Sequence, residues 1–218
     1  MRESRPIARS PITPASPEVI VEGWAVSGRR SRAGLTLTDC TPAAKVVLKA
    51  SAEGTIPERL GVPFGRAATQ TWTLGGHDVA VIIVGSGPGE WLVLAPPGAG
   101  AGVFDRVTAL AAESTGDLVS VLDLSHGRAL VRLTGARSAD LLAKETAVNL
   151  ADAVCPNGSA LRSALAGLAA DIVRDDRGSA RSYLVHCERS SGQYLFDSLL
   201  DAGAEFGIDV NGFVPPEI

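Results

Sequence analysis

Short apolar runs separated by glycine-rich turns occupy the first half of the chain. Residues 46–50 form one such run, and residues 70–74 alternate apolar and polar side chains. A glycine pair follows, then the longest uninterrupted apolar run at residues 79–84 and a further run at residues 91–95. Runs of this length bounded by glycine and proline are typical of strands. The last two are joined by the short loop at residues 85–89, which predicts a hairpin.

Helical spacing alternates with further strand patterns in the second half. Apolar residues recur every three or four positions at residues 103–113 and again at 136–145, which predicts two amphipathic helices. Between these segments lie two apolar runs, residues 118–124 and 129–133, on either side of a Ser-His-Gly turn. These two runs are expected to be strands joined by that turn.

The clearest helix is predicted at residues 190–206, after another pair of strands at 169–174 and 183–189. Ser190 followed by Gln193 fits a capping box at the start of this helix. The glycine directly after the segment can adopt the left-handed conformation that ends a helix. The side chains predicted to form the buried stripe are Leu195, Leu199, Ala202 and Phe206.

Strand pairs that are repeatedly followed by a helix predict an α+β fold with largely antiparallel sheets and flanking helices. Residues 35–212 are expected to form this domain, as one unit or as two subdomains. The Pro/Arg-rich residues 1–34 are expected to form an arm and a loop, and residues 213–218 a tail. The stretches 79–113 and 118–145, each strands followed by a helix, are candidate half-repeats.

The first part of the arm, residues 1–17, is expected to be extended and to contribute little to the core. Proline lacks a donor N–H and pushes the preceding residue out of the helical region. Two alternatives follow for this segment, namely disorder and docking along a partner subunit. The four prolines are Pro6, Pro11, Pro14 and Pro17.

Composition narrows the class of protein. A chain of 218 residues with 45% hydrophobic and 20% charged residues is globular and can bury a substantial core. Its net charge of −4 gives no general attraction to nucleic acid or to an anionic membrane, so neither is expected as a partner. The apolar runs are too short to span a bilayer, and the polar N-terminus does not resemble a secretory signal, so a cytoplasmic location is expected.

Two glycine-rich segments invite a ligand-binding interpretation. Residues 85–89 follow an apolar strand, but Glu90 stands where a dinucleotide-binding fingerprint needs its third glycine, and a strand follows in place of a helix. A hairpin turn is therefore favoured. Residues 98–102 do precede a helix, but Val103 occupies the third glycine position. A flexible connector is favoured there over a cradle for an anion.

The residue types of a hydrolase triad occur within four residues of one turn. Asp123, Ser125 and His126 are too close in sequence to form a relay by the usual arrangement. Asp123 and Ser125 are instead expected to accept backbone N–H groups and to shape the turn.

The histidines and cysteines show no metal-ligand spacing. In the strand predicted at 183–189, Cys187 should face away from His186 and Glu188, because side chains alternate across a strand. His77 stands alone after a glycine pair, and the odd number of separated cysteines predicts no disulfide framework. The residues therefore assign no catalytic, cofactor-binding or metal-binding side chain. The three cysteines are Cys40, Cys155 and Cys187.

An ordered set of short segments resembles the gamma subunit family of heterotetrameric sarcosine oxidase, and more distantly the T protein (aminomethyltransferase) of the glycine cleavage system. The set covers roughly residues 60–212. Its members are GPGEWLV at 87–93, DLSHGRA at 123–129 with LTG at 133–135, residues 152–158, YLFDSLLDAG at 194–203 and EFG at 205–207.

The departures from the aminomethyltransferase pattern are as informative as the matches. That family carries an R-T-G-Y-T-G-E segment that holds folate, whereas residues 174–180 here read R-D-D-R-G-S-A, without the Tyr or the Glu. Asp78 matches the family's acidic residue after a glycine pair. The resemblance thus implies the folate-binding fold without its folate contacts, and leaves open a residual ligand site near Asp78 or at residues 98–102.

The resemblance implies a non-catalytic structural subunit of a complex that demethylates sarcosine oxidatively to glycine and transfers the one-carbon unit to tetrahydrofolate. FAD, FMN, NAD, tetrahydrofolate and zinc would lie on other subunits, with none on this chain. The implied partners are large flavin- and NAD-binding alpha and beta subunits and a small zinc-binding delta subunit. The alternatives are a stand-alone folate-binding or one-carbon-transfer protein with an altered pocket, and a regulatory module that binds another anion at residues 98–102.

Overall fold

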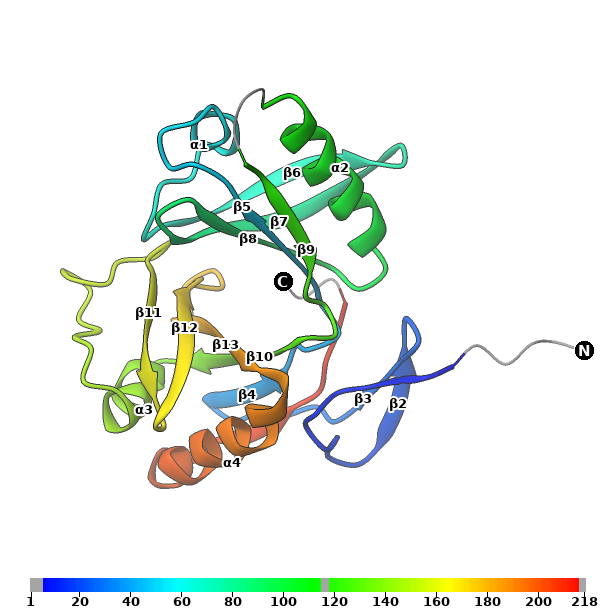
Figure 1. Ribbon diagram of the computed structural model, residues 1–218. Coiled ribbons are helices and arrows are strands. Elements are labelled where there is room, and N and C mark those ends of the chain that lie inside the picture. Colours follow the sequence, from blue (N-terminus) through cyan, green and yellow to red (C-terminus); the bar gives the residue numbers. More distant parts are fainter. Residues whose placement is uncertain (1–5, 115–117, 216–218) are drawn as a thin grey trace, which may run out of the picture.

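Two β-sheets packed face to face form the centre of the molecule, and a pair of helices covers the outer face of each sheet (Figure 1). The computed structural model describes residues 6–114 and 118–215. One apolar cluster fills the space between the two sheets. Each sheet has one further apolar cluster, which lies between that sheet and its own pair of helices. The predicted α+β class with largely antiparallel sheets and flanking helices is confirmed.

The five-stranded sheet is antiparallel throughout, with the strand order β6-β7-β8-β5-β9. Its two helices pack Ile56, Leu60, Val103 and Val107 against the sheet. The elements of this half are β5 (Ala44–Lys49), α1 (Ile56–Leu60), β6 (Ala67–Leu74), β7 (His77–Gly87), β8 (Glu90–Ala95), α2 (Gly100–Ala112) and β9 (Ser120–Asp123).

The six-stranded sheet has the order β11-β12-β13-β10-β4-β14, and only the pair β4 and β14 is parallel. Its strand β4 (Leu35–Asp39) precedes the whole five-stranded sheet in the sequence, whereas the other strands follow it. The remaining elements are β10 (Arg128–Gly135), α3 (Ser138–Glu145), β11 (Ala160–Leu165), β12 (Leu168–Arg174), β13 (Ser182–Glu188), α4 (Gly192–Gly203) and β14 (Asp209–Asn211).

The Ser-His-Gly turn is the point at which the chain passes from one sheet to the other. The predicted strands on either side of it exist, but they do not belong to the same sheet. Strand β9 pairs with β5, whereas β10 pairs with β13 and β4. The turn therefore sets how the two sheets face each other.

The fold contains an internal repeat, but at other boundaries than predicted. The segments β5-α1-β6-β7-β8-α2-β9 and β10-α3-β11-β12-β13-α4-β14 share one order of strands and helices. In each, the second, third, fourth and first strands lie side by side in that order. The predicted half-repeats at 79–113 and 118–145 are wrong, because the second one straddles the turn between the two sheets.

The predicted helix at 190–206 is three consecutive helical segments. A 3-10 turn, η1 (Arg189–Ser191), leads into α4, and a second, η2 (Ala204–Phe206), follows it. The helical run then ends at Gly207, whose φ of 68° confirms the predicted left-handed end. The capping box is wrong, since no side chain caps α4 and the Gln193 amide instead accepts the Thr13 N–H at 2.7 Å.

Leu195, Leu199 and Ala202 are buried against the six-stranded sheet, as the predicted stripe requires. Phe206 is only partly buried, because it lies at the end of the stripe. The Arg137 guanidinium covers its ring at 4.4 Å from the ring centre.

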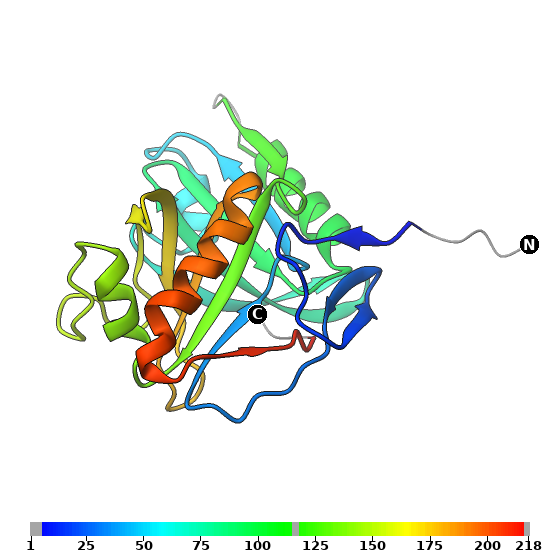
Figure 2. The ribbon, with the colours of Figure 1, turned by 90° about the horizontal axis from the view of Figure 1, so that it is seen from below.

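The N-terminal arm is part of the molecule's own core, which contradicts the prediction for residues 1–17. Its described part lies beside the start of α4 (Figure 2), and Ile12 is only 1% exposed within the apolar cluster under that helix. The arm also contributes to a small third sheet with the order β1-β3-β2. The strands of this sheet are β1 (Ala8–Arg9), β2 (Glu18–Val21) and β3 (Trp24–Ser27).

Phe213, at the start of the predicted tail, is likewise buried between the two main sheets. Residues 1–5 and 216–218 lie outside the described part of the chain. The division into an arm, a domain and a tail stays a prediction.

Candidate functional site

The glycine loop at residues 85–89 is a structural turn. It connects β7 and β8 with a shift of register between Gly85 and Gly87, and the predicted hairpin is confirmed. A Cβ atom on Gly85 would collide with the Pro63 carbonyl, and one on Gly89 would collide with the Ala50 carbonyl. Close approach of two backbones thus explains these glycines.

The Asp-Leu-Ser-His segment also serves the fold. The Asp123 carboxylate accepts the Ser125 N–H at 2.8 Å, and the Ser125 Oγ accepts the Lys45 N–H at 3.0 Å. The predicted turn-shaping role of these two side chains is confirmed. His126 stacks on Trp24, with ring centres 4.8 Å apart, and so links the turn to the small third sheet.

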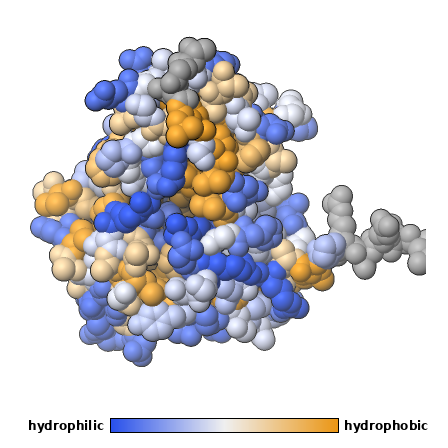
Figure 3. All heavy atoms as spheres, viewed as in Figure 1, coloured by the Kyte–Doolittle hydropathy of each residue, from blue (hydrophilic) through white to orange (hydrophobic). Residues whose placement is uncertain are grey.

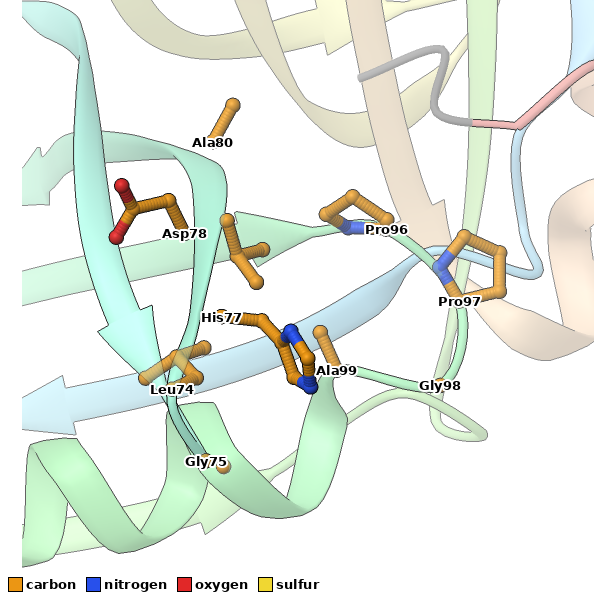
Figure 4. A pocket seen from close by; sticks show the side chains of 11 residues that line it. Leu74, Gly75, His77, Asp78, Ala80, Pro96, Pro97, Gly98 and Ala99 are labelled. Atoms are coloured by element: carbon orange, nitrogen blue, oxygen red, sulfur yellow. The ribbon is translucent and has the colours of Figure 1, made fainter.

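One surface hollow brings together the two places where the sequence left a ligand site open. The hollow has a volume of about 690 Å³, which is within the range of small-molecule sites, and its walls are mainly apolar. Asp78 comes from the start of β7, and residues 98–102 lead into α2. The lining residues shown in Figure 4 include His77, Asp78, Pro96, Pro97, Gly98 and Ala99.

The two ionisable groups of this hollow point in different directions. The His77 ring lies on the side of Gly98 and Ala99, whereas the Asp78 carboxylate points away from them (Figure 4). That carboxylate accepts a hydrogen bond of 2.8 Å from the Thr73 hydroxyl on the neighbouring strand β6. The hollow therefore offers room for a ligand but no acid–base pair.

The turn between β12 and β13, which replaces the folate segment, is closed by its own ion pairs. The buried Arg174 guanidinium donates to Asp176 at 2.9 Å, to Asp152 at 2.5 Å and to the Cys155 carbonyl at 2.7 Å. The hydrogen bond from Arg174 is the main reason that the pKa of Asp152 lies below its usual value. These groups satisfy one another.

Cys187 and His186 face opposite sides of β13, as predicted. The Cys187 side chain lies in the apolar cluster beneath α4, where burial raises the pKa of its thiol to about 11. His186 faces the other sheet, where burial lowers its pKa to about 4 although Asp171 lies 3.3 Å from its Nε2.

His186 belongs to a second cavity, which sequence reasoning missed. This inter-sheet cavity has a volume of about 240 Å³ and lies between the five- and six-stranded sheets. Lys45 is fully buried in it, and burial lowers the pKa of its ammonium to about 7. The local sequence signal for this cavity is that Lys45 directly precedes an apolar run, at a position where a strand would bury it. The lining residues are Lys45, Val47, Lys49, Ser86, Glu90, Leu92, Leu122, Leu124, Arg128, Arg162 and His186.

Within residues 6–114 and 118–215, no group of three or more His, Cys, Asp or Glu side chains is arranged to hold a metal ion. None of the helices in the same residues combines the length and the apolar character needed to cross a membrane.

Comparison with known families decides the relationship. The family model described as sarcosine oxidase, gamma subunit family matches residues 65–205, well over half of the chain. The chain belongs to this family. No curated protein matched the sequence.

Two solved structures share the fold of this gamma-family chain. Heterotetrameric sarcosine oxidase from Corynebacterium sp. U-96, in complex with pyrrole 2-carboxylate, matches at 23% identity with a TM-score of 0.62, over 79% of this chain and 85% of that chain. Aminomethyltransferase T of the glycine cleavage system from Bartonella henselae matches at 15% identity with a TM-score of 0.67. That match covers 89% of this chain and 55% of the enzyme.

In this gamma-family chain, the residues that replace the folate segment do not fit folate. Arg174 and Asp175 line a hollow of about 220 Å³, below the usual range for sites of drug-sized ligands. Asp175 is paired with Arg132 at 2.7 Å, just as Arg174 is paired with its own carboxylates. Both side chains are thus already engaged in ion pairs within the chain.

Proposed function

We propose that this chain is the structural gamma subunit of a heterotetrameric sarcosine oxidase, without a catalytic site of its own. The proposed complex demethylates sarcosine oxidatively to glycine and transfers the one-carbon unit to tetrahydrofolate. Its FAD, FMN, NAD, tetrahydrofolate and zinc would be held by the other subunits. These are large alpha and beta subunits and a small delta subunit, with which the chain assembles in the cytoplasm.

The ion-paired turn between β12 and β13 is the observation that supports the proposed absence of a catalytic site. Family membership gives the type of complex. In the turn, the charged side chains of Arg174 and Asp175 are used in internal ion pairs rather than directed at a ligand. A chain that keeps this fold without those contacts can still serve assembly through its surface.

The edge strand β9 supports an assembly role. Leu118, just before this strand, is 94% exposed, and Leu122 within it is also exposed. An apolar patch lies over this strand (Figure 3). Only one side of β9 is paired within the sheet, so its other edge can contact a partner chain. We therefore propose that a large subunit covers β9.

The test is co-expression of the chain with its proposed partner subunits, with recovery of the complex and turnover per bound flavin measured separately. The double variant Leu118→Asp, Leu122→Asp should reduce recovery of the complex and leave turnover per flavin unchanged. Val154→Asp changes an apolar residue outside the patch whose exposure of 62% lies between those of Leu118 and Leu122, and it serves as the matched control. Normal assembly of the double variant with reduced turnover per flavin would contradict the structural role.

One observation bears on the alternative, a stand-alone folate-binding or one-carbon-transfer protein. The hollow beside His77 is large enough for a ligand of folate's class, although its carboxylate Asp78 points away. Calorimetric titration of the isolated chain with tetrahydrofolate distinguishes the two proposals. We expect no binding. Micromolar binding that is lost in Ala80→Trp, which would fill the hollow, would support the alternative instead.

A further inference from the structure

The inter-sheet cavity contains buried polar groups that the protein leaves unsatisfied. Ser86 is 8% exposed and His186 is 5% exposed, and both line the cavity. Neither the Ser86 hydroxyl nor His186 Nδ1 has a hydrogen-bond partner among the described residues. Because buried polar groups are rarely left unpaired, these two indicate that something else occupies the cavity.

Two cations of the cavity have donors to spare. Below its pKa of about 7, the Lys45 ammonium carries three protons and donates two of them, to the Thr41 and Ala43 carbonyls at 2.8 and 2.7 Å. The Arg128 guanidinium pairs through Nη1 with the exposed Glu188 at 3.0 Å. A guanidinium has five N–H groups, so it can bind a further acceptor.

Among the described residues, Glu90 is the carboxylate that lines the cavity, and both of its oxygens are engaged by cations. Glu90 accepts from Lys49 at 2.9 Å through one oxygen and from Arg162 at 2.7 Å through the other. Arg162 is bound in turn to Asp171 at 2.6 Å. The remaining N–H and O–H groups of Lys45, Arg128 and Ser86 are donors, so an occupant that complements these three must supply acceptor oxygens and negative charge.

The volume and the walls restrict the occupant further. A volume of about 240 Å³ equals that of roughly eight water molecules in the liquid, too small for folate or a dinucleotide. Val47, Leu92, Leu122 and Leu124 line the rest of the cavity. Bulk water would leave these apolar walls unmatched, whereas a molecule with a short hydrocarbon part would cover them.

We propose that the inter-sheet cavity binds a small monocarboxylate with a short apolar body. The carboxylate accepts from Ser86, Lys45 and Arg128, and its hydrocarbon part contacts the leucine and valine walls. A ligand in this place bridges the two sheets, because Lys45 and Ser86 belong to one sheet and Arg128 to the other. It should therefore stabilise the folded chain. The site shares the wall residue Leu122 with the proposed assembly surface, but its polar contacts involve none of the residues of that surface.

Butyrate, butyramide and inorganic phosphate are the probes, titrated calorimetrically into the full-length chain in a buffer free of carboxylates. Butyrate should bind and raise the melting temperature, and its neutral isostere butyramide should do neither. Arg128→Gln and Ser86→Ala should each weaken butyrate binding by roughly tenfold or more, the effect of losing one hydrogen bond to a charged group. Arg106→Gln removes the same charge from the outer helix α2 and should leave binding unchanged.

Absence of butyrate binding at tens of millimolar, or an equal loss of binding in Arg106→Gln, would overturn the proposal. Tighter binding of phosphate than of butyrate would also overturn it, because the apolar walls would then play no part. The same titration on the assembled complex separates this proposal from the assembly role. Failure of the chain to assemble leaves binding to the isolated chain intact, and loss of binding leaves assembly intact.

Discussion

The buried arm can be tested with one substitution. Ile12 lies 1% exposed in the apolar cluster formed by the six-stranded sheet and α4. Truncation to Ala removes three methyl or methylene groups and leaves a cavity, which lowers the free energy of unfolding by about 2–5 kcal/mol at such sites. For a chain of this size, each kcal/mol corresponds to about 2–4 °C in melting temperature. Ile12→Ala should therefore melt about 4–20 °C lower.

The loss has an upper limit set by how strongly the arm is docked. If the arm detaches before the rest unfolds, the measured loss equals the free energy of docking and does not grow further. Deletion of residues 1–17 measures that limit, and it should destabilise the chain at least as much as Ile12→Ala. The Thr13 N–H to Gln193 bond at 2.7 Å and the Arg189 bond to the Arg9 carbonyl at 2.6 Å contribute to the same docking.

Ile7→Ala is the matched control, because Ile7 is on the same arm but 52% exposed. It should change the free energy of unfolding by no more than about 0.5 kcal/mol. Urea denaturation followed by circular dichroism gives both values, and an unchanged m-value would show that the denatured states are comparable. Equal and small effects of the two substitutions would refute a docked arm.

Three further predictions concern the core, the pH dependence and the glycine turn. Leu199→Ala, in the stripe of α4, should cost about 2–5 kcal/mol in urea denaturation, while turnover per flavin of any assembled complex stays unchanged. Burial lowers the pKa of His186 to about 4, so the unfolded chain binds more protons than the folded chain between about pH 6.5 and 4. Stability measured by urea midpoints should accordingly fall as the pH falls through that window, and His186→Gln should flatten the fall. Gly85→Ala should lower the melting temperature strongly, because its Cβ would meet the Pro63 carbonyl; an unchanged melting temperature would contradict the close approach of the two backbones.

Elements with a strong local pattern could be predicted from the sequence. The runs at 79–84 and 91–95 became β7 and β8, and the periodic segment at 103–113 became α2. Strand β4 was missed although Leu35 and Leu37 alternate with two threonines, a readable two-residue period. The arm was misjudged because proline content reports backbone conformation and not whether Ile12 packs on distant residues.

The features that depend on long-range pairing could not be predicted. Nothing in the Ser-His-Gly turn indicates that β9 and β10 join different sheets, because each strand pairs with segments far away in sequence. The inter-sheet cavity likewise collects Lys45, Ser86 and His186, which lie more than forty residues apart from each other along the chain. The pKa of a buried lysine or histidine is altered only when folding brings these distant segments together around it.

The position of β4 has a consequence for the order in which the chain folds during synthesis. Its partner β10 is made only after all of residues 44–123, which form the complete five-stranded sheet. That sheet can close on the ribosome as soon as β9 emerges, while β4 stays without its neighbour. An unpaired strand of alternating leucine and threonine is then exposed for the time needed to translate about ninety residues, several seconds at usual rates. Because the whole five-stranded sheet lies between β4 and β10 in the sequence, β4 is the segment of the nascent chain that chaperones should bind most.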